Sequence, residues 1–389
     1  MKLVFYSVVL NHHQAPLADA FYRLLGDDYI FVETGNLHDN KGATIDYSTR
    51  PYLLKAVTCS SNYLKAMQLA ETADCCVFAG LGALTFQKAR MKKGLLSFDM
   101  SERWLKQGWL NLFSPAIFRM WMAYHWGRWG NKPLYKLCCS AFAKQDQHFL
   151  GTYLQKCYKW GYFTQVDRFE VEASSDVSTS SIAPLMWCSR YLKLKHPELP
   201  ILLAHRLKKK GYKFVLDMYG SGEYEQASKD MAHRLQLEDV VRFKGNKPNH
   251  ELLADMRKHS IFLFTSDRNE GWGAVANESL GSGCVLVASD GIGSSPYLVK
   301  EANSGFLFQS PNPASSLDHP DQQSLQDLCD KVEWLLTHPQ EMNRMRQAAK
   351  HQMMELWAPE IAAKRLLCLI DHLQSNKETP FLEGPCSKA

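Results

Sequence analysis

The second half of the chain alternates short apolar runs with longer segments of helical period. The apolar runs predict strands near 185–188, 213–218, 240–243, 261–264, 285–288 and 305–308. Helical spacing separates these runs over 199–210, 223–235, 250–258, 274–282 and 295–300. Strand and helix in regular alternation predict a parallel sheet that is covered by helices on both faces.

The first half follows the same pattern less regularly. Strands are expected at 3–10, 29–33, 75–79, 95–98 and 134–139, and helices at 15–25, 61–72 and 142–158. The sequence therefore predicts an α/β protein of two Rossmann-like βαβ domains that face each other across a cleft. Open parallel sheets bind ligands beyond the carboxyl ends of their strands, so such a cleft suits a reaction between two substrates.

The predicted boundaries follow from breaks in this pattern. Residues 166–184 are polar without an apolar period and predict a linker. We expect one domain at 1–165, the second at 185–358, a helix at 359–374 that crosses back to the first domain, and a loose tail at 375–389.

Composition narrows the class of protein. The chain has 389 residues, of which 46% are hydrophobic and 22% charged, a profile typical of a soluble globular protein. No apolar run approaches the roughly 18 residues of a membrane span. The N-terminus lacks the features of a signal peptide. A cytoplasmic location is expected, with the eleven cysteines as reduced thiols.

The strongest candidate for chemistry is the segment 265–284, which follows an apolar strand and runs into a helix. Gly271 and Gly273 fall at the strand-to-helix turn, where glycine lets the backbone approach a ligand closely. Glu270 beside the turn could accept hydrogen bonds from sugar hydroxyls, and Glu278 from ribose hydroxyls. The spacing of the two glutamates alone favours two solvated surface residues, but its context of strand, glycine turn and helix favours a site.

This segment resembles the donor site of the retaining GT-B glycosyltransferases of family 4. The family pattern is an acidic residue, Gly, an aromatic residue, Gly, and then Glu before a helix of small residues. Glu270–Gly273 and Glu278–Gly283 take those places, with Trp272 where Phe is usual. Upstream, Cys188–Lys195 is similar to the family's Arg-spacer-Lys segment, although Ser189 and His196 replace two usual glycines.

The resemblance implies the GT-B fold and a nucleotide-sugar donor. It implies catalytic roles for Glu270, Arg190 and Lys195. It implies donor-binding roles for Glu278, Gly271, Trp272, Gly273, Ala274, Val275, Gly220 and Lys244. Two cations can neutralise the departing diphosphate, so no cofactor and no metal are required.

The resemblance assigns the acceptor to the first domain, where four candidate residues follow strands. His12 and His13 lie in the loop Asn11–Pro16, which is similar to the Asn-His-His start of some bacterial surface-polysaccharide glycosyltransferases. Asp99 and Glu102 follow the strand at 95–98. Structural hydrogen bonds of the histidines, and an ion pair of Glu102 with Arg103, are the alternatives.

Residues 88–136 combine ten Lys or Arg residues with five tryptophans. This stretch could lie on an anionic membrane surface at the inner face of the membrane. An aromatic cap over the domain core with a solvated basic rim explains the pattern equally well. A nucleic-acid partner is not expected, because no recognised module accompanies the aromatic and basic residues.

The predicted function is transfer of a hexose from a UDP- or GDP-sugar, with retention, to a glycan or lipid-linked acceptor in bacterial polysaccharide or glycoconjugate synthesis. The alternatives are a non-catalytic GT-B scaffold or sugar-binding protein, and a GT-B nucleotide-sugar epimerase. A phosphorylase would need a much longer chain. A nicotinamide dehydrogenase would need Gly-x-Gly-x-x-Gly after its first strand, where this chain has Asn11–Pro16.

Overall fold

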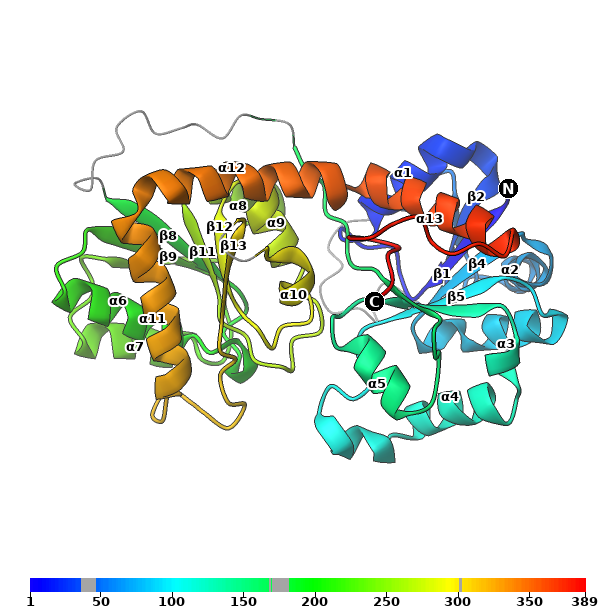
Figure 1. Ribbon diagram of the computed structural model, residues 1–389, viewed down its shortest axis with the longest axis horizontal. Coiled ribbons are helices and arrows are strands. Elements are labelled where there is room, and N and C mark those ends of the chain that lie inside the picture. The colour runs from blue at the N-terminus through cyan, green and yellow to red at the C-terminus, as the bar shows by residue number, and fades with distance from the viewer. Residues whose placement is uncertain (36–46, 168, 170–181, 301–302) are drawn as a thin grey trace. The chain divides into compact units, whose positions relative to one another are not determined.

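The computed structural model describes residues 1–35, 47–167, 169, 182–300 and 303–389. The chain divides into two compact units, unit 1 (residues 1–165 and 356–389) and unit 2 (residues 166–355). Each unit is an α/β layer structure around one parallel sheet, and Figure 1 labels its elements. The predicted fold class, two Rossmann-like parallel sheets, is confirmed.

Unit 1 contains, in its described part, a sheet of seven parallel strands in the order β3-β2-β1-β4-β5-β6-β7. The strands are β1 (Leu3–Ser7), β2 (Tyr29–Glu33), β3 (Leu53–Lys55), β4 (Cys75–Ala79), β5 (Ser97–Ser101), β6 (Leu134–Cys138) and β7 (Cys157–Lys159). The helices are α1 (Ala15–Leu25), α2 (Ser60–Thr72), α3 (Leu84–Lys93), α4 (Pro115–His125), α5 (Ala143–Phe149) and α13 (Pro359–Gln374). Because the helices cover the sheet, β1 and β4 are buried along their length, and Ser7 at the end of β1 is their one polar residue.

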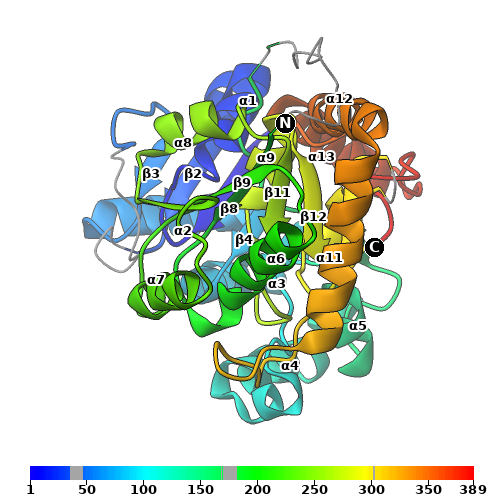
Figure 2. The same cartoon turned by 90° about the vertical axis from the view of Figure 1, so that its left-hand side faces the viewer.

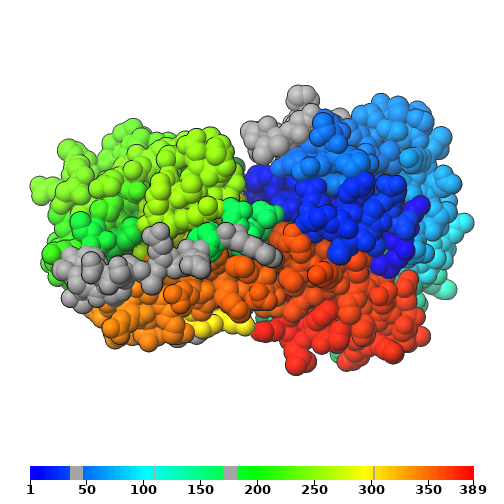
Figure 3. All heavy atoms as spheres, turned by 90° about the horizontal axis from the view of Figure 1, so that it is seen from above, coloured from blue at the N-terminus to red at the C-terminus, as the bar shows by residue number. Residues whose placement is uncertain are grey.

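Helix α13 lies near the C-terminal end of the sequence but belongs to unit 1. It packs against α1, and Arg23 of α1 donates to Glu360 of α13 at 2.6 Å. The space-filling view shows the surfaces of the two helices adjoining (Figure 3). Residues from opposite ends of the chain therefore complete one core.

Two predictions for unit 1 are wrong. The helix expected at 142–158 ends at Phe149, and β7 follows it. Gly151 lies between them with a positive φ of 67°, a conformation that interrupts a helix. The tail, which was expected to be loose, instead pairs with β7. The amide of Cys386 donates to the Lys159 carbonyl, and the amide of Lys159 donates to the Ser387 carbonyl. Cys386 and Ser387 are fully buried.

Unit 2 shows a six-stranded sheet among its described residues, in the order β10-β9-β8-β11-β12-β13. The strands are β8 (Ala183–Cys188), β9 (Phe214–Tyr219), β10 (Val241–Gly245), β11 (Ile261–Phe264), β12 (Val285–Ser289) and β13 (Gly305–Phe308). The helices are α6 (Glu198–Lys209), α7 (Glu225–Arg234), α8 (Asn249–Met256), α9 (Val275–Gly281), α10 (Ser295–Leu298), α11 (Gln322–Thr337) and α12 (Pro339–Leu356). The linker predicted at 166–184 lies largely outside the described residues.

One apolar cluster joins the sheet of unit 2 to its helices. Figure 2 shows α6 and α11 beside each other, and Arg206 of α6 donates to Gln322 and Gln326 of α11 at 3.1 and 2.8 Å. The strand order reverses between β8 and β11, which are neighbours. In open α/β sheets ligands bind at this reversal, beyond the carboxyl ends of the two strands. The strand order therefore predicts a ligand site at the segments that follow β8 and β11.

Candidate functional site

The segments after β8 and β11 meet through Lys195 and Glu270. The two side chains form an ion pair, and they are 12% and 15% exposed. Ser266 Oγ donates to Glu270 Oε2 at 3.2 Å, and Thr265 Oγ1 donates to the Lys195 carbonyl at 2.7 Å. The structure thus brings together two of the predicted catalytic residues, from positions 75 apart in the chain.

Arg190 reaches the same edge of the sheet from the end of β8. Its side chain is exposed. The backbone around it is held against the turn after β9, because Tyr191 N donates to the Ser221 carbonyl at 2.9 Å. Gly220 in that turn has a φ of 119°, and a Cβ there would lie 1.9 Å from the Ser189 carbonyl oxygen. Only glycine fits at Gly220, and this close approach fixes the backbone that carries Arg190.

The turn that leads from β11 into α9 is closely packed. Gly273 has a φ of 74°, and a Cβ would lie 2.2 Å from Phe264 Cζ. Trp272 is fully buried and its Nε1 donates to Asn277 Oδ1 at 2.8 Å, so its indole supports the turn from inside. Val275 begins α9, a helix of only seven residues, and Ala274 is its N-cap.

Glu278 lies one turn into α9 and is 8% exposed. Burial raises the pKa of this carboxyl to about 7, although a hydrogen bond from Asn249 opposes the rise. The Asn249 Nδ2 donates to Glu278 Oε1 at 3.0 Å. A buried carboxylate that accepts a hydrogen bond at one oxygen can still accept hydrogen bonds from hydroxyl groups of a ligand.

Lys244 lies in β10, whose last residue, Gly245, accepts from the amide of Gly220 at 2.9 Å. It lies 3.7 Å from Asp217 in a groove of about 440 Å³ beside β9, β10 and α8. The residues that line this groove include none of the segment 265–278. The donor-binding role of Lys244 stays a prediction.

His196 stands where the glycosyltransferases that the segment resembles usually have glycine, and the sequence predicted no role for it. Its φ of 47° is left-handed, which explains why glycine is usual there. Its ring is fully buried between Glu198, at 2.7 Å from Nδ1, and Asp267, at 3.3 Å from Nε2. The only signal in the sequence was the missing glycine, because Asp267 is 71 residues away.

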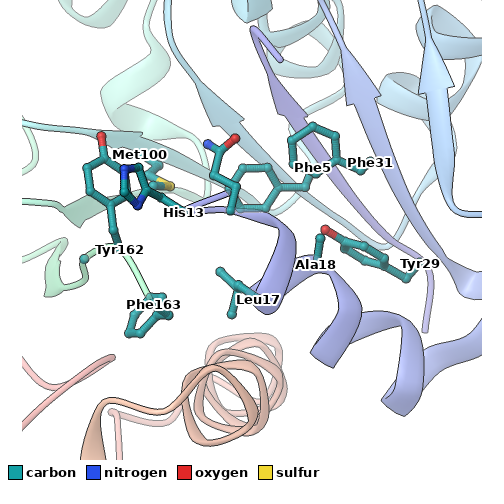
Figure 4. Close-up of a pocket in the computed structure, with 11 residues that line it drawn as sticks. Phe5, His13, Leu17, Ala18, Tyr29, Phe31, Met100, Tyr162 and Phe163 are labelled. Carbon is teal, nitrogen blue, oxygen red and sulfur yellow. The ribbon is translucent and has the colours of Figure 1, made fainter. Parts of the chain in front are cut away.

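In unit 1, His12 and His13 follow β1, and their rings are 3.7 Å apart. Burial and the neighbouring His12 lower the pKa of His13 to about 3, so His13 is neutral. Figure 4 shows the His13 ring beside Tyr162 at the end of an apolar cavity lined by Phe5, Leu17 and other residues. The cavity has space for about one water molecule.

Asp99 and Glu102 are engaged in separate internal contacts. Asp99 lies within β5 and accepts from Lys136 Nζ at 2.9 Å and from Tyr153 at 2.8 Å. Glu102 accepts from Lys106 at 3.5 Å and from Tyr162 at 3.3 Å. The alternative ion pair of Glu102 with Arg103 is wrong, because Arg103 pairs with Asp146 at 3.0 Å.

The basic stretch 88–136 is less exposed than its composition suggests. Arg90 is fully buried and donates to the carbonyls of Ala70, Ala73 and Leu96. Lys136 is also fully buried, against Asp99. No group of His, Cys, Asp and Glu among the described residues is arranged to hold a metal ion. Nor does any helix in the described ranges have the length and apolar character to cross a membrane.

Both the sequence and the fold of this chain are similar to those of known glycosyltransferases. Residues 185–352 match the family model for glycosyl transferases group 1. The structure is similar to the lipopolysaccharide outer core galactosyltransferase WaaB (TM-score 0.68, 13% identity, 96% of this chain and 100% of that one). It is also similar to Anabaena HepE in complex with UDP and glucose (TM-score 0.65, 15% identity, 96% and 100%). The fold is therefore that of the GT-B glycosyltransferases.

A similarity in sequence covers a shorter region. Over 148 residues the chain is 27% identical to the GtfA subunit of the UDP-N-acetylglucosamine–peptide N-acetylglucosaminyltransferase of Streptococcus pneumoniae serotype 4. The match spans 38% of this chain and 28% of that protein. The matched family model covers the β8 to α12 region, which holds Arg190, Lys195, Glu270 and Glu278.

Proposed function

We propose that this chain is a glycosyltransferase that takes a hexose from a UDP- or GDP-sugar and transfers it, with retention, to a glycan or lipid-linked acceptor. The observation that carries the proposal is the Lys195–Glu270 pair at the strand-order reversal of unit 2, beside the glycine turn and Glu278. The group 1 match over the same residues, and the UDP bound by similarly folded HepE, support a nucleotide-sugar donor.

The residues divide the work of donor activation. Negative charge develops on the diphosphate as the bond to the sugar breaks, and in this proposal Lys195 and Arg190 neutralise it. Glu270 holds the Lys195 ammonium and offers its carboxylate to sugar hydroxyls. Glu278 accepts from ribose hydroxyls. With retention, the acceptor hydroxyl attacks from the face that the diphosphate leaves, and a donor phosphate oxygen takes its proton.

The donor site is tested by thermal unfolding with UDP, GDP, ADP and their sugars, without added metal. One nucleotide series should raise Tm by roughly 5 °C when the ligand is at about 100 times its Kd. Glu278→Gln should abolish this rise while making the free protein more stable. The raised pKa of Glu278 means that wild-type stability falls as pH rises from about 4.5 to about 7, by on the order of 3 kcal/mol.

The Gln variant lacks this titration, so its advantage should be absent near pH 4.5 and complete above pH 7. A ligand response that survives in Glu278→Gln would remove Glu278 from the site. No response of the folded wild type to any of the nucleotides would contradict the proposed function and favour a non-catalytic scaffold.

We also propose that unit 1 docks on an anionic membrane surface, where a lipid-linked acceptor would lie. Large apolar side chains are exposed along residues 108–126, with Phe113 76%, Phe118 51% and Trp126 71% exposed. Arg119 and Arg128 beside them are also exposed. No Asp or Glu occurs between residues 103 and 145, so this stretch combines exposed apolar side chains with basic residues and contributes no acidic one.

Sedimentation with vesicles tests this surface. Wild type should bind vesicles that contain phosphatidylglycerol and not vesicles of phosphatidylcholine alone, and added salt should weaken the binding. Serine at Phe113, Phe118 and Trp126 together should reduce binding roughly tenfold or more. Leu64→Ser, at a residue of α2 that is 66% exposed, is the matched control and should bind normally. Equal binding of the triple variant would contradict the proposal.

A further inference from the structure

The loop that carries Lys195 and the loop that carries Glu270 are joined beneath their ion pair by a buried cluster of three side chains. His196 is the central residue, with Glu198 at the start of α6 on one side and Asp267 of the segment after β11 on the other. All three residues are at most 1% exposed. Buried polar side chains that are hydrogen-bonded to one another fix the relative position of the segments to which they belong.

Both ring nitrogens of His196 lie within hydrogen-bond distance of a carboxylate. A neutral imidazole has only one N–H, so two donated bonds require the protonated ring. Burial lowers the pKa of His196, but hydrogen bonds and charge from Asp267 and Glu198 outweigh it and raise the pKa to about 9. The ring is therefore cationic at neutral pH, and it offsets one of the two buried negative charges.

Asp267 connects this cluster to the catalytic glutamate. Its amide donates to the Leu194 carbonyl at 2.9 Å, and its Oδ1 accepts from the amide of Asn269 at 2.7 Å. Its carbonyl accepts from the amide of Glu270 at 3.0 Å. A shift of Asp267 would therefore move the turn that presents Glu270. The neighbour of His196 in the chain is Lys195, so the cluster fixes both partners of the ion pair.

We propose that His196, through Glu198 and Asp267, is a positioning residue that holds the Lys195 loop and the Glu270 loop in register for the donor diphosphate. This inference deepens the proposed function and rests on it. The left-handed backbone conformation at His196 costs less energy for glycine than for histidine. The histidine side chain must therefore make interactions that offset this cost. The two carboxylate contacts supply these interactions.

Two variants separate positioning from simple structural support. His196→Gly removes both contacts and suits the backbone, but it leaves two buried carboxylates without a cation. The triple variant His196→Gly, Glu198→Gln, Asp267→Asn removes the charges as well, so it should retain the fold. Leu207→Ala, at a fully buried apolar position of α6, is the control for loss of stability alone.

Calorimetric titration with UDP and with GDP, together with steady-state kinetics, gives the readout. We expect the triple variant to bind the nucleotide roughly tenfold to a hundredfold more weakly than wild type, with a higher donor KM and a lower kcat. Leu207→Ala should lower Tm and leave both the affinity and KM unchanged. If the triple variant bound the nucleotide as tightly as wild type, the inference would be overturned while the proposed function stands.

A wild type that binds neither UDP nor GDP would instead overturn the proposed function, and the positioning role with it. The two failures are distinguishable because the first is seen only in the variants and the second already in the wild type.

Discussion

Replacing Lys195 by alanine is expected to lower kcat for sugar transfer by roughly 100- to 1000-fold, because charge on the departing diphosphate loses its best-placed cation. The Lys195 ammonium is partly buried and held by Glu270, so water replaces it poorly. In the variant, Glu270 also loses its cationic partner, which adds to the loss. Initial rates of nucleoside diphosphate release at saturating donor give the comparison directly.

Lys193→Ala is the matched control, since Lys193 is an exposed cation two residues away in the same loop. Its kcat should equal that of the wild type, because the side chain is solvated. Equal rates for the Lys195 and Lys193 variants would show that general positive charge, rather than the position of Lys195, supports the reaction. An unchanged kcat in Lys195→Ala would contradict the mechanism.

Replacing Gly220 by alanine is expected to lower the free energy of unfolding by about 3 kcal/mol or more and to abolish nucleotide binding. The new Cβ would lie 1.9 Å from the Ser189 carbonyl oxygen, so the backbone leading to Arg190 must move. Urea denaturation measures the stability, and calorimetric titration measures the binding that remains in the folded fraction.

Gly211→Ala separates the clash from the backbone conformation. Gly211 also has a positive φ, of 79°, but nothing lies within 4 Å of the Cβ position. This control should cost only about 1 kcal/mol and should leave binding intact. If the two variants were equally stable and bound nucleotide equally well, the close approach at Gly220 would have no role in the site.

The sequence predicted unit 2 well because its pattern is local. Each strand is a short apolar run bounded by turn residues, and each helix has its own period, so no long-range contact is needed to identify them. The candidate donor segment could be proposed for the same reason, since Glu270, Gly273 and Glu278 lie within nine consecutive residues. Lys195 and Arg190 came from the resemblance, and the strand order then explains why Lys195 meets Glu270.

The failures depend on contacts between distant residues. The tail is ordered by pairing with β7, about 230 positions earlier in the chain, which no local pattern reveals. Lys136 and Arg90 read as surface cations, but Asp99 and a set of carbonyl groups receive them inside unit 1. His196 was missed because its partner Asp267 lies 71 positions away, in the segment after β11.

The central claim is that unit 2 binds the nucleotide-sugar at the strand-order reversal, with the diphosphate at Lys195. A crystal structure of the protein with UDP, or with GDP if the thermal panel selects it, tests this most directly. We predict diphosphate oxygens within hydrogen-bond distance of Lys195 Nζ and ribose hydroxyls on the Glu278 carboxylate. Nucleotide bound elsewhere, with Lys195 and Glu278 free of it, would contradict the account.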